Sequence, residues 1–371
     1  MTNDIQQSSK PQFREATNLL RGICALAILI FHYQHFFYTG TRIDNFNTEM
    51  QPFYGALSFL YLNGARAVQI FWCISGLILT HAYFAKKGTD AYSFFLSRFS
   101  RLYPLHLITL LVVALLQFSS KKNLNTFQIY ESNNKTSFFL NLLYVQKWIP
   151  GTGLSFNAPT WSVSIELSVY IMFFIVLKLI QRYRELVPIL ILIALQFAKV
   201  YFRTYATNLF FYECLTYFTA GVFLYFFIER LNNLSVRPIQ LVCEFSLLGG
   251  FCTVLYYKYE VEPSSPLWLA IGVLTVFLVA QIDGSRLAPL LIKAKMLGDL
   301  SYSVFLWHVP IQIAIKLVQA EFSIDNSIAY NKLFFIFFIG LTYCVGFLSY
   351  RFIEQPAQRL IQKRFAYTAT N

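Results

Sequence analysis

Three ionisable side chains lie within one long apolar segment near the N-terminus, "LLRGICALAILIFHYQHFF" (19–37). Arg21 lies close to its start, and His32 and His35 lie well inside it. At 3.6 residues per turn, the spacing brings Arg21 and His32 to one helix face, roughly 16 Å apart along the axis. His35 falls close to the same face. Ionisable groups inside a membrane span usually face a cavity and take part in function, so His32 is a candidate for proton transfer. Arg21 alone also fits a snorkelling anchor.

Two more ionisable residues lie in later apolar segments. "NAPTWSVSIELSVY" places Glu166 about one and a half turns inside a helix that starts with an interfacial Trp161. A carboxylate there needs a partner, and a histidine or arginine of another helix is the obvious candidate. "LGDLSYSVFLWHVP" places His308 roughly 13 Å from the inner end of its helix, at the depth expected of the first histidine. Two neighbours add hydrogen-bonding groups, although each taken singly is more typical of packing: Ser301 and Tyr302.

A basic pair occurs in "SRFSRLYPLH". Arg98 and Arg101 are one helical turn apart and are expected on the cytoplasmic face. Two guanidinium groups beside Tyr103 could bind phosphates in bidentate fashion. Ordinary inner-face charges are the alternative interpretation.

The segment "GARAVQIFWCISGLIL" starts with Arg66 near the outer face, where the arginine is either an anchor or faces an acceptor. Ser75 and Gly76 interrupt this segment and favour close approach of another helix. Ser75 is not part of a G-x-S-x-G elbow, so we reject it as a hydrolase nucleophile. The sequence has no Walker loop, H-E-x-x-H or dinucleotide-binding fingerprint, and we expect no metal site.

The elements that position these residues are long apolar runs. Hydrophobic residues make up 56% of the 371-residue chain and charged residues 13%, and the mean hydropathy is +0.50. These values exclude an ordinary soluble domain. We predict an all-α, polytopic membrane protein with about ten transmembrane helices and a structured loop over 119–159. The expected spans are 17–38, 66–84, 102–118, 160–180, 187–203, 208–228, 240–257, 265–282, 299–319 and 331–353.

Lysine and arginine in the loops predict the orientation. The expected inner segments carry more of them than the outer segments, which favours both termini in the cytoplasm. We attribute the net charge of +12 to this bias and not to nucleic-acid binding. The N-terminal residues are too polar for a cleaved signal peptide, so the first span is expected to be retained. The six cysteines all lie in apolar runs and are interpreted as small buried residues, neither disulfides nor metal ligands.

Taken together, these motifs resemble acyltransferase family 3, the integral-membrane O-acyltransferases. "LRGICALAILIFH" is similar to the family's first helix, with arginine and histidine at the family's spacing, and Asn18 stands where many members have an acid or amide. "FWCISGL" resembles the signature of the second helix, with Trp72 and Cys73 departing from the usual residues. "SRFSRLYPLH" resembles an arginine-rich family segment, with His106 in place of an aromatic. "WSVSIE", "SYSVFLWH" and "RFIEQP" follow in the family's order, so the resemblance covers residues 18–356.

The resemblance implies a domain organisation and an activity. Residues 17–356 would form the membrane acyltransferase domain, between cytoplasmic tails at 1–16 and 357–371, and this membrane part would have to act alone. Such proteins move an acyl group, commonly acetyl, from cytoplasmic acyl-CoA to a hydroxyl of a surface polysaccharide or lipid-linked saccharide. No permanently bound cofactor is expected, because acetyl-CoA is a co-substrate. The location would be a bacterial inner membrane.

The resemblance also assigns roles to the residues above. Arg21, Arg98, Arg101 and Tyr103 would hold acyl-CoA, and a neutral His32 would serve as general base or transient acyl carrier. Glu166 would orient a histidine or contact the saccharide, and His308 would assist. Four residues are acceptor-binding or structural: Arg66, Trp161, Ser301 and Tyr302.

Two other functions fit the same residues. A proton-coupled transporter of a saccharide or lipid-linked sugar could use His32, His308 and Glu166 as a proton relay. The sequence lacks an inverted repeat and paired broken helices, and such a carrier has no need of a basic cytoplasmic mouth. An inactive scaffold for polysaccharide synthesis is a third possibility, which retention of both Arg21 and His32 disfavours.

Overall fold

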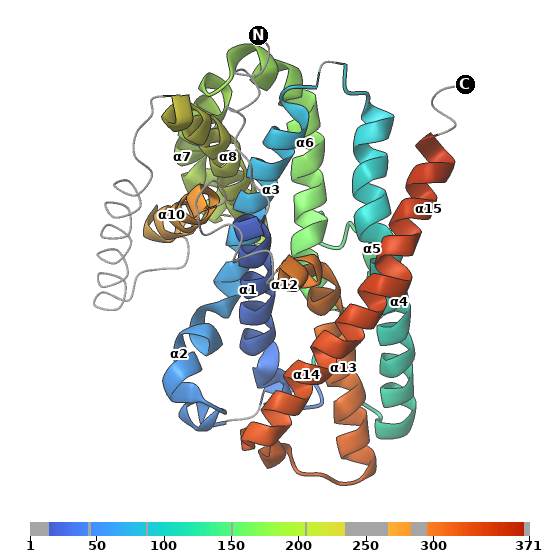
Figure 1. Cartoon of the computed structure of the whole chain (residues 1–371). Coiled ribbons are helices and arrows are strands. Elements are labelled where there is room, and N and C mark those ends of the chain that lie inside the picture. The colour runs from blue at the N-terminus through green and yellow to red at the C-terminus, as the bar shows by residue number, and fades with distance from the viewer. Residues whose placement is uncertain are drawn as a thin grey trace. The chain divides into compact units, whose positions relative to one another are not determined.

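The computed structural model describes residues 15–43, 46–86, 88–149, 151–204, 206–233, 266–282 and 295–366. These residues are helical apart from connecting loops and one short hairpin, β1 (Tyr38–Thr39) and β2 (Arg42–Ile43) (Figure 1). The chain divides into two compact units, and the first holds the described parts of 1–23, 68–88 and 168–299. The second holds those of 24–67, 89–167 and 300–371.

The first unit contains the start of α1 (Glu15–Phe31), most of α3 (Ala67–Tyr83) and the end of α6 (Trp161–Tyr183). Its other helices are α7 (Leu186–Thr204), α8 (Ala206–Asn233), α10 (Pro266–Ile282) and α12 (Lys295–Asp299).

Helices α3 and α8 approach closely through two glycines. A Cβ on Gly76 would collide with the carbonyl of Phe218, and a Cβ on Gly221 would collide with the carbonyl of Cys73. Because each glycine faces the other helix's backbone, the contact is reciprocal. The close approach predicted at Gly76 is therefore confirmed.

The second unit is built on three long helical segments, α4 (Ala91–Leu124), α13 (Ser301–Glu321) and α14 (Lys332–Ser349). A π-helical turn, η7 (Tyr350–Glu354), joins α14 to α15 (Gln355–Ala366), and both α13 and α15 pack against α4 (Figure 1). The smaller helices are η1 (His32–Phe37), η2 (Thr48–Met50), α2 (Tyr54–Asn63), η3 (Gly64–Arg66), α5 (Lys135–Leu142), η4 (Ala158–Thr160) and η6 (Asn326–Tyr330).

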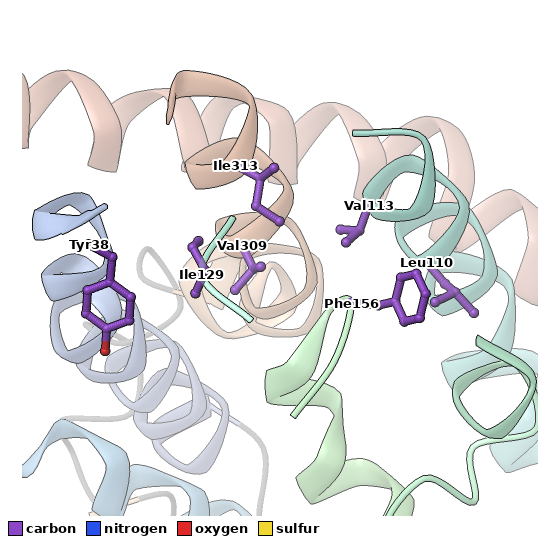
Figure 2. Close-up of a cluster of buried hydrophobic side chains, with 7 residues drawn as sticks. All are labelled: Tyr38, Leu110, Val113, Ile129, Phe156, Val309 and Ile313. Atoms are coloured by element: carbon purple, nitrogen blue, oxygen red, sulfur yellow. The ribbon is translucent and has the colours of Figure 1, made fainter. Parts of the chain in front are cut away.

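A cluster of buried apolar side chains joins α4 and α13 to the long loop between α4 and α6 (Figure 2). Its seven members are Tyr38, Leu110, Val113, Ile129, Phe156, Val309 and Ile313. The loop also bonds to α4 directly: the side-chain amide of Gln117 both donates to and accepts from the backbone of Gln128, at 2.8 and 2.9 Å. The structured loop predicted over 119–159 is confirmed, with helix α5 and buried apolar residues inside it.

Seven helical segments among the described residues are long and apolar enough to cross a membrane, and two shorter apolar helices accompany them. The polytopic all-α prediction is confirmed. The shorter helices, Leu186–Ala198 and Pro266–Gln281, fall on two expected spans. The span expected at 240–257 lies outside the described residues.

Three predicted boundaries were wrong, in each case because the helix is longer than its apolar run. The second span begins with α2, so Arg66 lies at an internal break and not at the start. Helix α4 begins where the carboxylate of Asp90 accepts from the Ser93 N–H, at 2.8 Å. The last segment continues through Pro356, because the wide turn of η7 accommodates a residue that lacks a backbone donor.

The prediction that all cysteines are buried was wrong for Cys344, which is exposed on α14. Within a membrane span an exposed face meets lipid, where an apolar thiol is tolerated. Three others are buried and form no disulfide with the described residues, as predicted: Cys24, Cys73 and Cys214. Cys243 and Cys252 lie outside the described residues.

Candidate functional site

Three imidazole rings form a cluster inside the second unit. The ring of His32 stacks on that of His308, with centroids 4.9 Å apart and an interplanar angle of 29°. The centroid of the His35 ring lies 5.0 Å from that of the His32 ring. His32 and His35 belong to a 3₁₀ turn, η1, in which side chains three residues apart lie almost directly above one another. The two histidines expected at matching depth, His32 and His308, are thus brought together, and the third is added by the tight turn.

Backbone carbonyls fix which nitrogen of each ring carries the proton. The Nδ1–H of His32 donates to the carbonyl of Ile28 at 3.0 Å, and the Nδ1–H of His308 donates to that of Phe305 at 2.6 Å. A carbonyl only accepts, so both rings keep the lone pair on Nε2 when they are neutral. The Nε2 of His308 is buried and has no hydrogen-bond partner among the described residues. His32 is only partly buried, so its Nε2 is the more accessible base.

Gln312 of α13 connects the histidines to one another. Its side-chain oxygen accepts from the Nδ1 of His35 at 3.0 Å, and its nitrogen donates to the backbone carbonyl of His32 at 2.8 Å. The hydroxyl of Tyr130 lies 3.5 Å from the Nε2 of His35. These bonds hold the η1 turn against α13 and keep His35 in the same tautomer as the other two rings.

One face of α13 is polar along almost its whole length and is nevertheless buried. Residue spacing at 3.6 per turn places these side chains within one narrow stripe. Its members are Ser301, His308, Gln312, Lys316 and Gln319. Within the part of the chain that the structure describes, the hydroxyl of Ser301 and both polar atoms of Gln319 have no hydrogen-bond partner. A buried polar stripe with unpartnered atoms is typical of a helix that lines a binding site and not a dry core.

The basic residues of α4 lie at the start of the second unit's long helix. Arg98 is partly buried, and its Nη2 donates to the Ser97 hydroxyl at 3.0 Å. Its Nε is buried, and none of the residues that the structure describes binds it. Arg101 lies one turn later, and the ring of Tyr103 stacks on that of Phe99 at 4.6 Å. Both arginines therefore lie on one helix, one turn apart.

A pair of tyrosines lies next to this part of α4. The hydroxyls of Tyr144 and Tyr302 are 3.2 Å apart, and that of Tyr302 donates to the carbonyl of Leu102 at 2.5 Å. Burial raises the pKa of Tyr144, and the carboxylate of Glu166 adds to this rise. Glu166 is thus within electrostatic range of Tyr144, a partner that the sequence did not predict. Trp161 is the first residue of α6, the helix that contains Glu166, and it is partly buried.

Two polar residues without a predicted role form a buried pair. The hydroxyl of Ser303 donates to the carboxylate of Glu354 at 2.6 Å, and both side chains are buried. Glu354 ends the π-helical turn, a type of irregularity that is frequent at functional sites. His106 is also buried. Its Nε2–H donates to the backbone carbonyl of Asn141 at 2.8 Å, and its ring stacks on that of Tyr144 with centroids 3.6 Å apart. Spacing alone could not reveal these partners, because each lies on another segment.

Arg21 belongs to the first unit, where it borders a cavity of about 390 Å³. Its Nη1 donates to the side-chain oxygen of Asn18 at 3.2 Å, and the nitrogen of Asn18 donates to Asp299 at 2.8 Å. The cavity is lined by Glu15, Thr17, Asn18, Arg21, Ile78, Lys295 and Asp299. It contains two cationic side chains, but two carboxylates partly balance them.

Among the described residues, no group of three or more His, Cys, Asp or Glu side chains could hold a metal ion. The groups described above that could take part in chemistry are neutral imidazoles, carboxylates and guanidinium groups.

Comparison with known proteins decides the family. The family described as "Acyltransferase domain" matches residues 14–351. The chain belongs to this acyltransferase family. Its motifs and its membrane helices therefore come from one family domain that extends across nearly the whole chain.

Three curated proteins are similar to the chain. Acyltransferase MdmB of Streptomyces mycarofaciens is 29% identical over 44% of this chain and 39% of its own length. O-acetyltransferase OatA of Staphylococcus aureus is 22% identical over 99% of this chain and 61% of its own. Nodulation protein 10 of Rhizobium leguminosarum bv. viciae is 23% identical over 94% of both. The chain thus spans less than two thirds of the first two relatives. No solved structure matches it.

Proposed function

We propose that the protein is a membrane O-acyltransferase in which His32 is the general base or transient acyl carrier. One observation carries the proposal: His32 donates its Nδ1–H to a backbone carbonyl and stacks on His308, so a lone pair on Nε2 is available at a partly buried site. Family membership and the similarity to O-acetyltransferase OatA support O-acyl transfer.

The proposed donor is an acyl-CoA, with acetyl as the acyl group. Coenzyme A carries several phosphates, and guanidinium groups bind phosphates in bidentate fashion. The adjacent Arg98 and Arg101, with Tyr103, supply such groups in the second unit, and Arg21 supplies one beside the cavity of the first. The donor would come from the cytoplasm, with both chain termini on the same side of a bacterial inner membrane.

The proposed acceptor is a hydroxyl of a surface polysaccharide or lipid-linked saccharide. Glu166, which is partly buried, and the buried polar stripe of α13 are the groups proposed to face it, since carboxylate and amide oxygens accept hydrogen bonds from hydroxyls. Trp161, Arg66, Ser301 and Tyr302 are proposed as acceptor-binding or structural neighbours. No nucleic-acid partner is proposed.

The reaction can be written with few groups. The acceptor O–H transfers its proton to the Nε2 of His32 while its oxygen forms a bond to the thioester carbonyl carbon. The C–S bond then breaks, and the proton passes from the imidazolium to the departing thiolate, which gives an ester and free CoA thiol. In the alternative order, Nε2 attacks the thioester first and the acyl-imidazole passes the acyl group to the acceptor.

Radiolabelled acetyl-CoA and a polysaccharide extract of the host test the proposal in nanodiscs. We expect His32→Ala to lower label transfer and CoA release at least about 100-fold, the usual loss on removal of a general base, with normal membrane insertion. His81→Ala is the matched control, because this histidine belongs to α3 of the first unit, and it should keep activity.

Normal transfer by His32→Ala would exclude the mechanism. If the wild type neither binds nor consumes acetyl-CoA or longer acyl donors, O-acyl transfer itself is excluded and the transporter hypothesis takes its place.

A further inference from the structure

Helix α13 has a proline at its centre, two residues after His308. Pro310 has no backbone N–H, so it cannot donate the usual helical hydrogen bond to the residue four positions earlier. That residue is Leu306, which is fully buried. A buried carbonyl that loses its donor and meets no other lowers stability.

Asn157 supplies the missing donor from outside the helix. Its side-chain nitrogen donates to the carbonyl of Leu306 at 2.8 Å, and the side chain is fully buried. The backbone of Asn157 is itself fixed, because the N–H and the hydroxyl of Thr160 both donate to its carbonyl, at 3.0 and 2.8 Å. A side chain on the turn before α6 thus completes the hydrogen bonding of a distant helix.

The completed turn is the one that carries His308. The ring's Nδ1–H donates to the carbonyl of Phe305, which directly precedes the carbonyl bound by Asn157. The orientation of the imidazole therefore depends on where this proline-containing turn places its carbonyls.

We propose that Asn157 is a positioning residue that replaces the helical donor missing at Pro310 and so holds His308 in place against His32. The expected effect of Asn157 on the reaction rate rests on the proposed acyl transfer, whereas its role in positioning His308 does not. A merely space-filling role fits poorly, because the side-chain oxygen of Asn157 is buried and finds no partner in the described ranges, and an apolar residue would avoid that loss.

The test is a double-mutant cycle of Asn157→Ala and Pro310→Ala, since alanine at 310 restores a backbone N–H for Leu306. The readout is modification of His308 by diethyl pyrocarbonate, followed by mass spectrometry, which needs no substrate. We expect Asn157→Ala to raise the labelling rate about tenfold in the natural background, but less than about twofold when Pro310→Ala is present.

Asn141→Ala is the matched control. Asn141 is also a fully buried asparagine of the second unit with an unpartnered oxygen, but its nitrogen donates to Ser137 and Ser155, away from any proline. Its effect should be the same in both backgrounds. Equal effects of Asn157→Ala in both backgrounds, or none in either, would overturn the proposal.

Folding and activity give two further outcomes. If Asn157→Ala alone does not accumulate, the double variant should restore folded protein, and its failure to do so counts against the proposal. In the acetyl-CoA assay, kcat should follow the labelling pattern, with a loss of about tenfold at unchanged donor KM. An unchanged kcat would contradict the positioning role. A wild type without activity would refute the acyltransferase proposal, while labelling would still decide this one.

Discussion

Single side chains at the histidine cluster are held by atoms from other segments. The Nδ1–H of His32 is bound within its own helix, but His35 and the carbonyl of His32 both depend on Gln312 of α13. In such a network, removing one member leaves buried polar atoms unsatisfied, which costs more than the bond itself contributes.

Gln312→Leu should therefore destabilise the protein by about 2 kcal/mol and lower acyl transfer, because it leaves the Nδ1–H of His35 and the carbonyl of His32 without partners. The measurement is thermal unfolding in detergent, followed by the acetyl-CoA assay. Gln319→Leu is the control: this buried glutamine lies on the same face of α13, and both its polar atoms already lack partners among the described residues. It should be neutral or stabilising, and equal losses for both variants would contradict the argument.

At the scale of elements, close packing sets the position of the cluster. The turn η3 passes so near α1 that a Cβ on Gly64 would collide with the carbonyl of Ala27, and it would also crowd Phe31, directly before His32. Glycine is the residue that permits this approach. The contact fixes the end of α1 directly before His32.

Gly64→Ala should destabilise the second unit by about 3 kcal/mol, because backbone must move to admit the methyl group. Gly55→Ala, in α2 of the same unit, is the control. A Cβ there meets nothing within 4 Å, so alanine should stabilise the helix by about 0.5 kcal/mol. Unfolding midpoints of both variants in nanodiscs check the difference, and a neutral Gly64→Ala would show that η3 is free to shift.

The arginine pair of α4 leads to a second prediction at the scale of elements. Arg98→Ala and Arg101→Ala should each raise the donor KM about tenfold, the effect of losing one charge-assisted hydrogen bond, with a milder loss of rate at saturating donor. Arg359→Ala removes an exposed charge from α15, which packs against α4, and should leave the KM unchanged. Initial rates against acetyl-CoA concentration distinguish these outcomes. An unchanged KM in both α4 variants removes the pair from the donor site.

The orientation of the whole molecule in the membrane can be predicted from the charges of its loops. Ten spans return the chain to the side on which it started, so both termini should be cytoplasmic. Fusions of green fluorescent protein to either terminus should fluoresce, and fusions of alkaline phosphatase at the same positions should be inactive. A terminus with the opposite pattern would mean that the number of spans is odd.

Much of the architecture could be predicted from the sequence because lipid imposes long apolar segments. His32 and His308 could be placed at one depth because helical rise is regular. Three things could not be predicted. The second span starts before Asn63-Gly64, a turn-forming pair that favours a boundary where the structure has only an internal break. The proximity of Glu166 to Tyr144 and the bond of Asn157 to Leu306 join segments that no periodicity relates. The 3₁₀ geometry of η1 has no recognisable signal in the pattern of apolar residues.

That coil makes the site sensitive to chain length. In η1 three residues complete a turn, so His32 and His35 form a vertical column, whereas an ordinary α-helix would rotate the second ring by about 60° relative to the first. Inserting or deleting one residue between them would turn every later side chain of the coil by about 120°. Inserting three residues would restore the alignment of the two rings, one turn further apart. Natural length variation in this part of the chain is therefore expected only in whole turns.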